Sequence, residues 1–577
     1  MLSRSACYRR YRQESFAVQQ PEPGSRPLSS LFNEIERGSI KVPQFQREFV
    51  WTKEKSARLL DSLIKGYPIG TFILWRTKEE LRSIRNLGGV DLPPTPKGDS
   101  VQYVLDGQQR LTSLFASLKG LNVVRSGKTE DFREMFVDLE AGPEEILVLT
   151  ERPEQSTNRC VPVTDFMNMD FDELSIPAIY RKRVKEFKGS MQGYLCSVIV
   201  VPEAEIDTAT EIFTRINVTG KPLSVFEVMV AKTYDYEQDF DLAEKSSRLI
   251  EELADHDYGT VPDIVLLQVS SAIMTKECAK KDILQLNKQA FIDTWETTED
   301  AIRSAVDYLR ASFGIPVSQL LPYKALLVPL AYFFAKHPDP PAGFMHDSLR
   351  DFFWRVSLGG RYSYSLETRL AQDIKRIDTV LEGKRPEYDY PVNPTSEFVQ
   401  ENGAFNTGRS FIKAILCCLA SKKPKSFNNN AEVIINNDWL KRANSKNYHH
   451  FFPKGSFHGD SASDERINHI ANITIVDEYL NKRVIKAKRP SEYIGAFLES
   501  NSQLGESLHT HLIDLNDAGV LQDDFDRFFA YRCEAIAQEL ARGLIPQEVD
   551  QQLQAPNRDD FEDFETSQRL EIELDEE

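Results

Sequence analysis

Four of the nine histidines in this chain fall within 21 residues: His449, His450, His458 and His469. The segment 448–452 and the segment 472–476 are short and apolar-edged, as strands are, and a polar loop separates them. Asp477 can then cap a basic helix that carries Asn481. Strand, loop, strand and helix with these side chains form a ββα-metal layout. In such a site a divalent cation polarises the scissile phosphate, and a neutral imidazole takes a proton from the attacking water. The pattern therefore predicts phosphodiester hydrolysis.

A second polar cluster is the turn Asp106-Gly107-Gln108-Gln109-Arg110. Residues 102–105 predict a short strand before it, and leucines and a phenylalanine at helical spacing predict a helix after it. A helix N-terminus leaves amide hydrogens unpaired and carries partial positive charge, so it can receive a phosphate. Arg110 adds a fork of donors, and Asp106 adds a carboxylate for a bound Mg²⁺ or a water. The turn predicts a nucleotide site. The alternative is an ordinary turn in which Arg110 and Asp106 pair with each other.

The composition of the 577 residues is that of a multidomain globular protein. No apolar run approaches the roughly 20 residues that cross a bilayer, and the N-terminus has no apolar signal core, so we expect a cytoplasmic protein with no membrane partner. The seven cysteines include no C-x-x-C pair, which argues against a disulfide framework and a zinc knuckle. Reduced, mostly buried thiols are expected.

The net charge of −18 is unevenly distributed along the chain. Residues 548–577 contain 12 acids and 2 bases, a net charge of −10. Residues 421–490 contain 13 Lys and Arg against 7 Asp and Glu, a net charge of +6. A basic module followed by an acidic tail is compatible with DNA binding. The tail is either a solvated end or a segment that lies over the basic face and competes with DNA.

The periodicity predicts an α+β fold that is predominantly helical. Helices are expected at 28–38 and from Thr52 to 66, and strands at 71–75, 136–139 and 197–201. Helical spacing dominates from 206 to 420, and Pro, Asn and Lys-rich stretches follow. The predicted organisation is a disordered lead (1–26), a nucleotide-binding domain (27–205), a helical middle domain (206–420), a nuclease module (421–545) and a disordered acidic tail (546–577).

Three stretches in the first domain carry a resemblance to a known family. VPQFQREFVW, YPIGTFILW and VLDGQQRLTSLF, in this order, resemble the N-terminal domain of GmrSD-type modification-dependent restriction enzymes. The resemblance implies a ParB/sulfiredoxin-like fold and NTP hydrolysis at the DGQQR turn, with Asp106 as a catalytic residue. It implies that Gln44 and Arg47 face one pocket with this turn; the alternative for these two is a hydrogen-bonded loop anchor.

Two later stretches are also similar to the family. FTRINVTGKPLS, at 213–224, resembles a signature in which Arg215 and Asn217 complete the nucleotide site. An equally acceptable interpretation is a helix C-cap with Gly220 as the left-handed residue. The stretch Arg361–Ser365 is similar too, but no chemistry follows from it.

The histidine-rich segment resembles the HNH nuclease module that follows the ParB-like domain in single-chain GmrSD-type enzymes. Carried over by position, the resemblance implies that His450 is the general base, that His449 and Asn481 hold the metal, and that Asn472 fixes the loop carrying the base. The family often has Asp at the position of His449. A neutral ligand set suits Mn²⁺, Ni²⁺ or Zn²⁺ better than Mg²⁺. Adjacent strand residues point to opposite faces, so both histidines serve one site only if the strand bends; otherwise the pair is structural.

The basic helix after the second strand is the predicted DNA contact. Its cationic side chains would bind backbone phosphates without contacting the bases: Lys482, Arg483, Lys486, Lys488 and Arg489. The alternative for any one of them is a solvated helix face.

Together these features predict a nucleotide-responsive, metal-dependent endonuclease of an anti-phage restriction system. The expected substrate is double-stranded DNA, from phage or bearing a modification, and this last step depends wholly on the resemblance. The alternative is a nucleotide-gated DNA-binding regulator, or an NTPase, with an inactive HNH module. The sequence does not name the NTP or the modification, and it leaves a homo-oligomer open.

Overall fold

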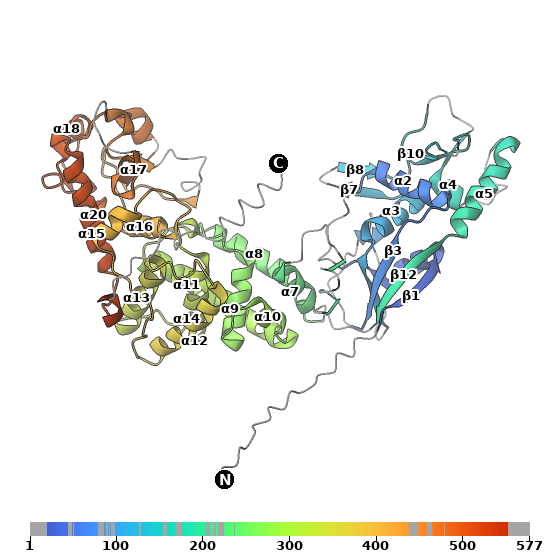
Figure 1. The fold of residues 1–577 in the computed structure, drawn as a ribbon, viewed down its shortest axis with the longest axis horizontal. Helices are drawn as coiled ribbons and strands as arrows, with labels where there is room; N and C mark the ends of the chain where they lie inside the picture. The colour runs from blue at the N-terminus through green and yellow to red at the C-terminus, as the bar shows by residue number, and fades with distance from the viewer. Residues whose placement is uncertain are drawn as a thin grey trace, which may run out of the picture. The chain divides into compact units, whose positions relative to one another are not determined.

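The computed structural model describes residues 20–43, 49, 51–78, 86–87, 90–91, 93, 99–125, 128–142, 144–153, 159–168, 176–202, 208–209, 212, 215–216, 224–235, 237–437, 448–457, 464–477 and 479–551. The chain divides into two compact units, residues 1–241 and 242–577, called here the N-terminal unit and the C-terminal unit. Figure 1 shows the elements of each unit.

The N-terminal unit is built on a five-stranded mixed sheet in the order β1-β12-β3-β6-β2. Its strands are β1 (Glu22–Pro27), β2 (Ile40–Lys41), β3 (Thr71–Thr77), β6 (Val101–Asp106) and β12 (Leu195–Pro202). β1 and β12 pair antiparallel, as do β3 and β6, whereas β12 pairs parallel with β3 and β2 pairs parallel with β6. In Figure 1 β1, β12 and β3 run side by side.

Six helices and several small sheets complete the described part of the N-terminal unit. The helices are α1 (Leu28–Glu36), α2 (Lys53–Ile64), α3 (Gln108–Lys119), α4 (Val163–Asn168), α5 (Arg181–Gln192) and α7 (Val225–Thr233). A three-stranded sheet contains β9 (Phe136–Asp138), β10 (Val148–Leu149) and β11 (Cys160–Pro162), and two hairpins pair β4 (Asn86–Leu87) with β5 (Val90–Asp91) and β7 (Asn122–Arg125) with β8 (Lys128–Asp131). The expected helices at 28–38 and from Thr52 are confirmed. The Thr52 hydroxyl accepts a hydrogen bond from the backbone N–H of Lys55 at 3.3 Å, as an N-cap does.

The N-terminal boundary of the fold differs from the prediction. The sequence predicted a disordered lead through residue 26, but β1 already begins at Glu22 and pairs with β12 along its whole length. Pro23, Gly24 and Pro27 give this strand the composition of a loop. An edge strand tolerates proline because one side of its backbone needs no ladder hydrogen bond.

The C-terminal unit is predominantly helical. Its first part contains α8 (Leu242–Ala254), α9 (Asp263–Thr275), α10 (Lys280–Leu284), α11 (Lys288–Ser312), α12 (Leu327–Lys336), α13 (Phe344–Leu358), α14 (Leu366–Leu381), α15 (Ser396–Asn402) and α16 (Ser410–Ser421). Its second part contains β13 (Tyr448–His450), α17 (Asp464–Ile467), β14 (Ile473–Ile475), the π-helical segment η8 (Leu480–Ile485), α18 (Pro490–Ser500), α19 (Leu504–Thr510), α20 (Phe525–Ala541) and the 3₁₀ helix η10 (Glu548–Gln551). An α+β fold that is mainly helical agrees with this content.

The domain boundaries differ from those expected at 205/206, 420/421 and 545/546. The two units separate after Asp241, and the second contains both the helical segment and the histidine-rich segment. α20 contacts both α15 and α16, so these segments share one core. η10 lies in the stretch that was expected to be a disordered tail. A sequence pattern shows where a helix ends but not which distant helix covers its apolar face.

None of the described helices is both long enough and apolar enough to cross a membrane. Six of the seven cysteines lie in the described part of the chain, and all six are buried free thiols, as expected. Burial raises the pKa of the Cys196 thiol to about 11, so this group stays protonated and unreactive at neutral pH.

Candidate functional sites

The predicted strand–loop–strand–helix order is present in the C-terminal unit. β13 and β14 pair antiparallel, with His449 opposite Thr474 and His450 opposite Ile473. The Asp477 carboxylate accepts a hydrogen bond from the backbone N–H of Leu480 at 2.8 Å, and so caps the helical segment that follows. This segment is shorter than predicted: η8 ends at Ile485 in π-helical geometry.

His449 lies in the core beneath the hairpin. Its side chain is 1% exposed, and its ring is in edge contact with the rings of Phe427 and Tyr493. The Thr474 hydroxyl lies 3.0 Å from His449 Nδ1 and donates to the His449 carbonyl oxygen. The imidazole therefore donates from Nδ1, and its buried Nε2, which carries the lone pair, has no hydrogen-bond partner among the described residues. Burial lowers the pKa of His449 to about 3.

The surroundings of His449 are unfavourable for binding the predicted divalent cation. The donor that His449 offers is one neutral nitrogen among aromatic rings. Within the described ranges, no group of three or more His, Cys, Asp or Glu side chains is placed to hold a metal ion. Asn481 is half-buried in η8, and His458 lies outside the described residues. The described donor set thus does not fit a hard divalent cation, and the metal roles of His449 and Asn481 stay predictions.

His450 is placed differently from its neighbour. Its side chain is half-buried, and its Nε2 lies 3.3 Å from the side-chain oxygen of Asn468. Because an amide oxygen only accepts, the imidazole donates from Nε2 and Nδ1 carries the lone pair. Burial lowers the pKa of His450 below its ordinary value, which keeps the ring neutral at pH 7. A neutral imidazole whose Nδ1 carries a lone pair is suited to take a proton from water.

Asn472 joins the two strands of the hairpin at their ends. Its side-chain oxygen accepts from the backbone N–H of Phe452 at 2.9 Å, and its Nδ2 donates to the carbonyl oxygens of Phe452 and Ile467. The side chain is completely buried, so it reaches no substrate. Its contribution is to hold the loop that follows His450. The sequence did not indicate Asn468, the partner of the imidazole, although it lies only four residues before Asn472.

Two further histidines of this region, His469 and His511, have backbone partners. The backbone N–H of Ala471 donates to His469 Nδ1 at 3.1 Å, and His469 Nε2 lies 3.3 Å from the carbonyl oxygen of Gln400. His511 Nε2 lies 2.9 Å from the carbonyl oxygen of Lys425. His509 is exposed, whereas His511, two residues later, is only 2% exposed.

We expect the C-terminal unit to lose stability as the pH falls below about 6.5. Burial lowers the pKa of His469 and of His511 to about 4, below their ordinary value of 6.5. Above pH 6.5 both residues are neutral whether folded or unfolded, so they add nothing to the pH dependence. Below pH 6.5 the two histidines bind protons in the unfolded chain but not in the folded chain. The free energy of unfolding therefore falls by roughly 1.4 kcal/mol per pH unit for each histidine.

Urea denaturation at pH 7, 6 and 5 measures this loss. His511→Gln keeps a side-chain amide to donate to the Lys425 carbonyl oxygen but cannot titrate, so the slope of stability against pH should become shallower. His509→Gln, at an exposed position of the same segment, is the matched control and should leave the slope unchanged. Equal slopes for wild type and His511→Gln would contradict the prediction.

The predicted DNA-binding residues share one short stretch. All five are exposed in η8 or in the turn that follows it: Lys482, Arg483, Lys486, Lys488 and Arg489. The turn is set by Lys486, whose φ is +56°. The structure therefore presents five cations to solvent within eight residues, directly after the β13–β14 hairpin.

In the N-terminal unit, the turn at 106–110 joins β6 to α3, as predicted. Gly107 is the N-cap of α3 and has a φ of +92°. A Cβ at this position would lie 2.6 Å from Cδ1 of Phe72. Both the backbone conformation and the close ring require glycine here.

Arg110 binds within the fold. Its Nη1 donates to the carbonyl oxygen of Ile69 at 2.8 Å, and its Nη2 donates to the carbonyl oxygen of Thr71 at 3.0 Å and to Asp106 Oδ2 at 3.1 Å. A Cβ on Gly70 would lie 1.9 Å from Nη1. The pairing of Arg110 with Asp106, the alternative left open by the sequence, is therefore present. The Asp106 side chain is 35% exposed, so solvent reaches it.

The remaining predicted nucleotide-site residues are only partly placed. Gln44, Arg47 and Asn217 lie outside the described residues, and Arg215 is exposed. Gln108 and Gln109, in the first turn of α3, are both buried. The structure thus brings together Asp106, Gly107 and Arg110. The Ile69–Thr71 backbone was missed as part of this cluster, although the glycine in YPIGT was a signal of close approach.

The Arg361–Ser365 stretch, which had no predicted chemistry, belongs to a buried ionic network. Arg361 Nε lies 2.9 Å from Asp373 Oδ2, and both side chains are fully buried. Arg376 also binds Asp373, at 2.6 Å, and Tyr390 packs against the guanidinium group of Arg361. Asp373 is enclosed by cations of this chain, so the network is structural.

Residues 28–234 match the family model for the N-terminal domain of the GmrSD restriction endonuclease. The chain is also 25% identical over 535 residues to the uncharacterized protein MJ0686 of Methanocaldococcus jannaschii, an alignment that covers 84% of this chain and 88% of that protein. The family match supports a GmrSD-type relationship and indicates a restriction-type nuclease with DNA as its substrate.

Proposed function

We propose that this protein is a DNA endonuclease of a restriction system in which the β13–β14 hairpin carries phosphodiester hydrolysis and the N-terminal unit binds and hydrolyses an NTP. The restriction part is supported by the match of residues 28–234. The nuclease part depends chiefly on one observation: His450 is a neutral imidazole, held through Nε2 by Asn468, in the same unit as a stretch of exposed cations.

In the proposed reaction, His450 Nδ1 takes a proton from a water molecule. The water oxygen forms a bond to phosphorus, and the bond between phosphorus and the leaving sugar oxygen breaks. The leaving oxygen gains a proton from solvent, and His450 returns its proton to solvent. Asn472 keeps the loop after His450 in place through its bonds to Phe452, so the imidazole stays at a fixed position relative to the phosphate. None of these steps is assigned to the divalent cation, for which His449 and Asn481 remain the predicted ligands.

The substrate we propose is double-stranded DNA, of phage origin or bearing a modification. Five exposed cations from Lys482 to Arg489 can neutralise backbone phosphates, which positions a duplex without reading its bases. The modification enters from the family alone, because no described residue identifies it.

The direct test is nicking of a supercoiled plasmid by the purified full-length protein. The assay compares modified with unmodified DNA, with and without each NTP, and with Mn²⁺ or with a chelator. Conversion of supercoiled to open-circular DNA that requires the protein supports the proposal. Absence of nicking under every combination would favour the second candidate function, a nucleotide-gated DNA-binding regulator with an inactive nuclease module. That candidate is favoured by the incomplete cation site among the described residues.

We expect Asp106→Ala to abolish NTP hydrolysis while the protein stays folded. Asp106 is the partly exposed carboxylate of the turn, and it accepts one of the three hydrogen bonds that Arg110 donates. Arg110→Ala should abolish hydrolysis as well, but it should also destabilise the N-terminal unit by roughly 1–3 kcal/mol, because the Ile69 and Thr71 carbonyls lose their donor.

Phosphate release and thermal melting, measured on the same preparations, separate the two effects. Arg133→Ala is a matched control, since the side chain of this exposed arginine binds the partly exposed Asp131 and makes no hydrogen bond to the DGQQR turn among the described residues. Hydrolysis at the wild-type rate in both the Asp106→Ala and Arg110→Ala variants would place the nucleotide site elsewhere.

A further inference from the structure

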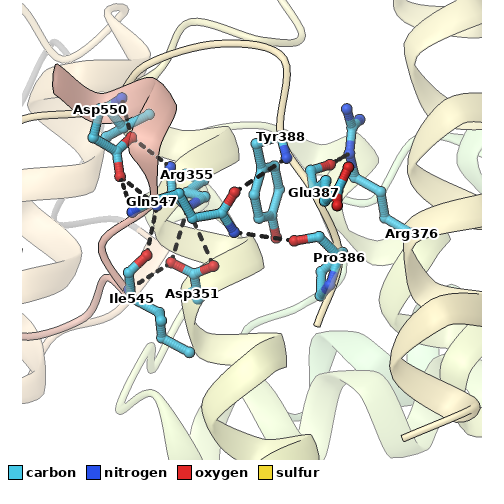
Figure 2. Close-up of polar contacts among 10 residues, drawn as sticks. Asp351, Arg355, Arg376, Pro386, Glu387, Tyr388, Ile545, Gln547 and Asp550 are labelled. Atoms are coloured by element: carbon cyan, nitrogen blue, oxygen red, sulfur yellow. Dashed lines mark hydrogen bonds and ion pairs between the residues drawn. The ribbon is translucent and has the colours of Figure 1, made fainter. Parts of the chain in front are cut away.

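The chain beyond α20 returns to α13 and is held there by the partly buried carboxylate of Asp550 (Figure 2). Asp550 accepts hydrogen bonds from both terminal nitrogens of the Arg355 guanidinium group, with Nη1 at 2.8 Å from Oδ1 and Nη2 at 2.7 Å from Oδ2. The backbone N–H of Val392 donates to Oδ1 at 3.0 Å, and that of Gln547 donates to Oδ2 at 2.8 Å. Each carboxylate oxygen therefore accepts two hydrogen bonds.

Further contacts fix the same stretch, Ile545–Gln551, called here the C-terminal anchor. The backbone N–H of Ile545 donates to Asp351 at 2.7 Å, and its carbonyl oxygen accepts from Arg355 at 2.6 Å. The Gln547 side chain donates to the carbonyl oxygen of Pro386 at 3.0 Å, and Figure 2 shows this bond beside Tyr388. Arg355 is fully buried under the anchor. The anchor is thus a docked part of the C-terminal unit.

The residues after the anchor carry a concentrated negative charge. Residues 552–577 contain ten acids and two bases, a net charge of −8. The same unit exposes the five cations between Lys482 and Arg489. Twenty-six residues span at most about 90 Å when extended, whereas a compact unit of this length has a radius of gyration of about 20 Å. A segment that starts at the anchor is therefore long enough to reach these cations from any point on the unit.

We propose that residues 552–577 act as a tethered polyanion that occupies the exposed basic stretch Lys482–Arg489 and competes with DNA for it. The anchor holds the start of the segment on the C-terminal unit, which gives its carboxylates a high local concentration at that stretch. Opposite charges on the two stretches favour this intramolecular contact, and salt weakens it. The inference rests on the proposed function, because it assigns DNA as the competitor, and it adds a regulation that the nuclease proposal does not contain.

The experiment measures binding of a fluorescein-labelled 20-base-pair unmodified duplex by anisotropy at 50 and 300 mM salt. It compares the full chain, a chain that ends at Gln551, and a full-length chain whose ten acids in 552–577 are replaced by their amides. We expect both variants to bind about 10-fold or more tightly than the full chain at 50 mM salt, and the difference to fade at 300 mM. A full-length chain with residues 552–577 in shuffled order keeps the charge and should bind as the wild type does.

Carbodiimide crosslinking of the full chain without DNA provides the second measurement. Peptide mapping should find bonds between carboxylates of 552–577 and Lys482, Lys486 or Lys488 at low salt, and few at high salt. If the crosslinks form but the protein does not bind DNA, the intramolecular contact is supported and the proposed function is refuted. Equal DNA affinity of the full and shortened chains at low salt, or absence of the crosslinks, would overturn the inference.

Discussion

Replacing His450 with alanine is expected to lower DNA cleavage by roughly 10²–10⁴-fold, the amount that general-base catalysis supplies, without unfolding the protein. The side chain is half-buried, and its hydrogen bond to the exposed Asn468 is long at 3.3 Å. Its loss should therefore cost little stability. NTP hydrolysis measured without DNA should be unchanged, since that predicted site lies in the N-terminal unit.

Plasmid nicking and thermal melting of three variants test this expectation. His509→Ala, an exposed histidine of the same unit, is the matched control and should nick as the wild type does. His449→Ala should instead destabilise the protein by roughly 2–5 kcal/mol, because it removes a ring that is packed in the core. Normal cleavage by His450→Ala would refute the proposed base. A folded His449→Ala variant that has lost Mn²⁺ binding would show that His449 is a metal ligand after all.

The second large effect is expected from a pair of fully buried arginines with opposite surroundings. Arg355 is held between the carboxylates of Asp351 and Asp550. Although burial by itself would lower its pKa, these carboxylates raise the pKa of Arg355 above its ordinary value. Arg355→Met would leave both acids without their cation, Asp351 in the protein interior and Asp550 in the anchor itself. We expect a loss of roughly 3–5 kcal/mol in the free energy of unfolding.

Arg532 provides the comparison at equal burial. In the part of the chain that the structure describes, it has no ion pair, and it donates one hydrogen bond, from Nη2 to the carbonyl oxygen of Ile473 at 3.0 Å. Its buried Nε and Nη1 have no hydrogen-bond partner among those same described residues, and burial lowers its pKa to about 10. Arg532→Met removes an uncompensated charge, so it should be close to neutral or stabilising.

Urea unfolding of both methionine variants at pH 7 decides between the two expectations. The side-chain volume and the burial are matched, so the difference between the variants isolates the carboxylate partners. Equal losses for Arg355→Met and Arg532→Met would show that packing, and not charge pairing, determines the cost. A stabilised Arg355→Met variant would show that the anchor contributes nothing to the fold.

Local patterns were sufficient to predict the elements that carry the candidate chemistry. The short, apolar-edged segments 448–452 and 472–476 predicted the two strands β13 and β14, and Asp477 predicted the cap of the segment after them. The DGQQR turn was correctly expected between a strand and a helix, and its glycine adopts a left-handed conformation in the structure. These features depend on a few neighbouring residues, whose backbone preferences and side-chain periodicity act over one or two turns of chain.

Contacts between distant parts of the chain decided what those elements do. Spacing put His449 and His450 on opposite faces, but only the packing of Phe427 and Tyr493 made His449 the core residue. Likewise Arg110 had a carboxylate four residues away, but its two carbonyl partners come from the end of the Ile69–Thr71 turn. The anchor is the extreme case, since Arg355 and Asp550 are 195 residues apart. Burial and ion pairing depend on which surfaces the whole chain brings together, and a local sequence pattern carries no information about those long-range contacts.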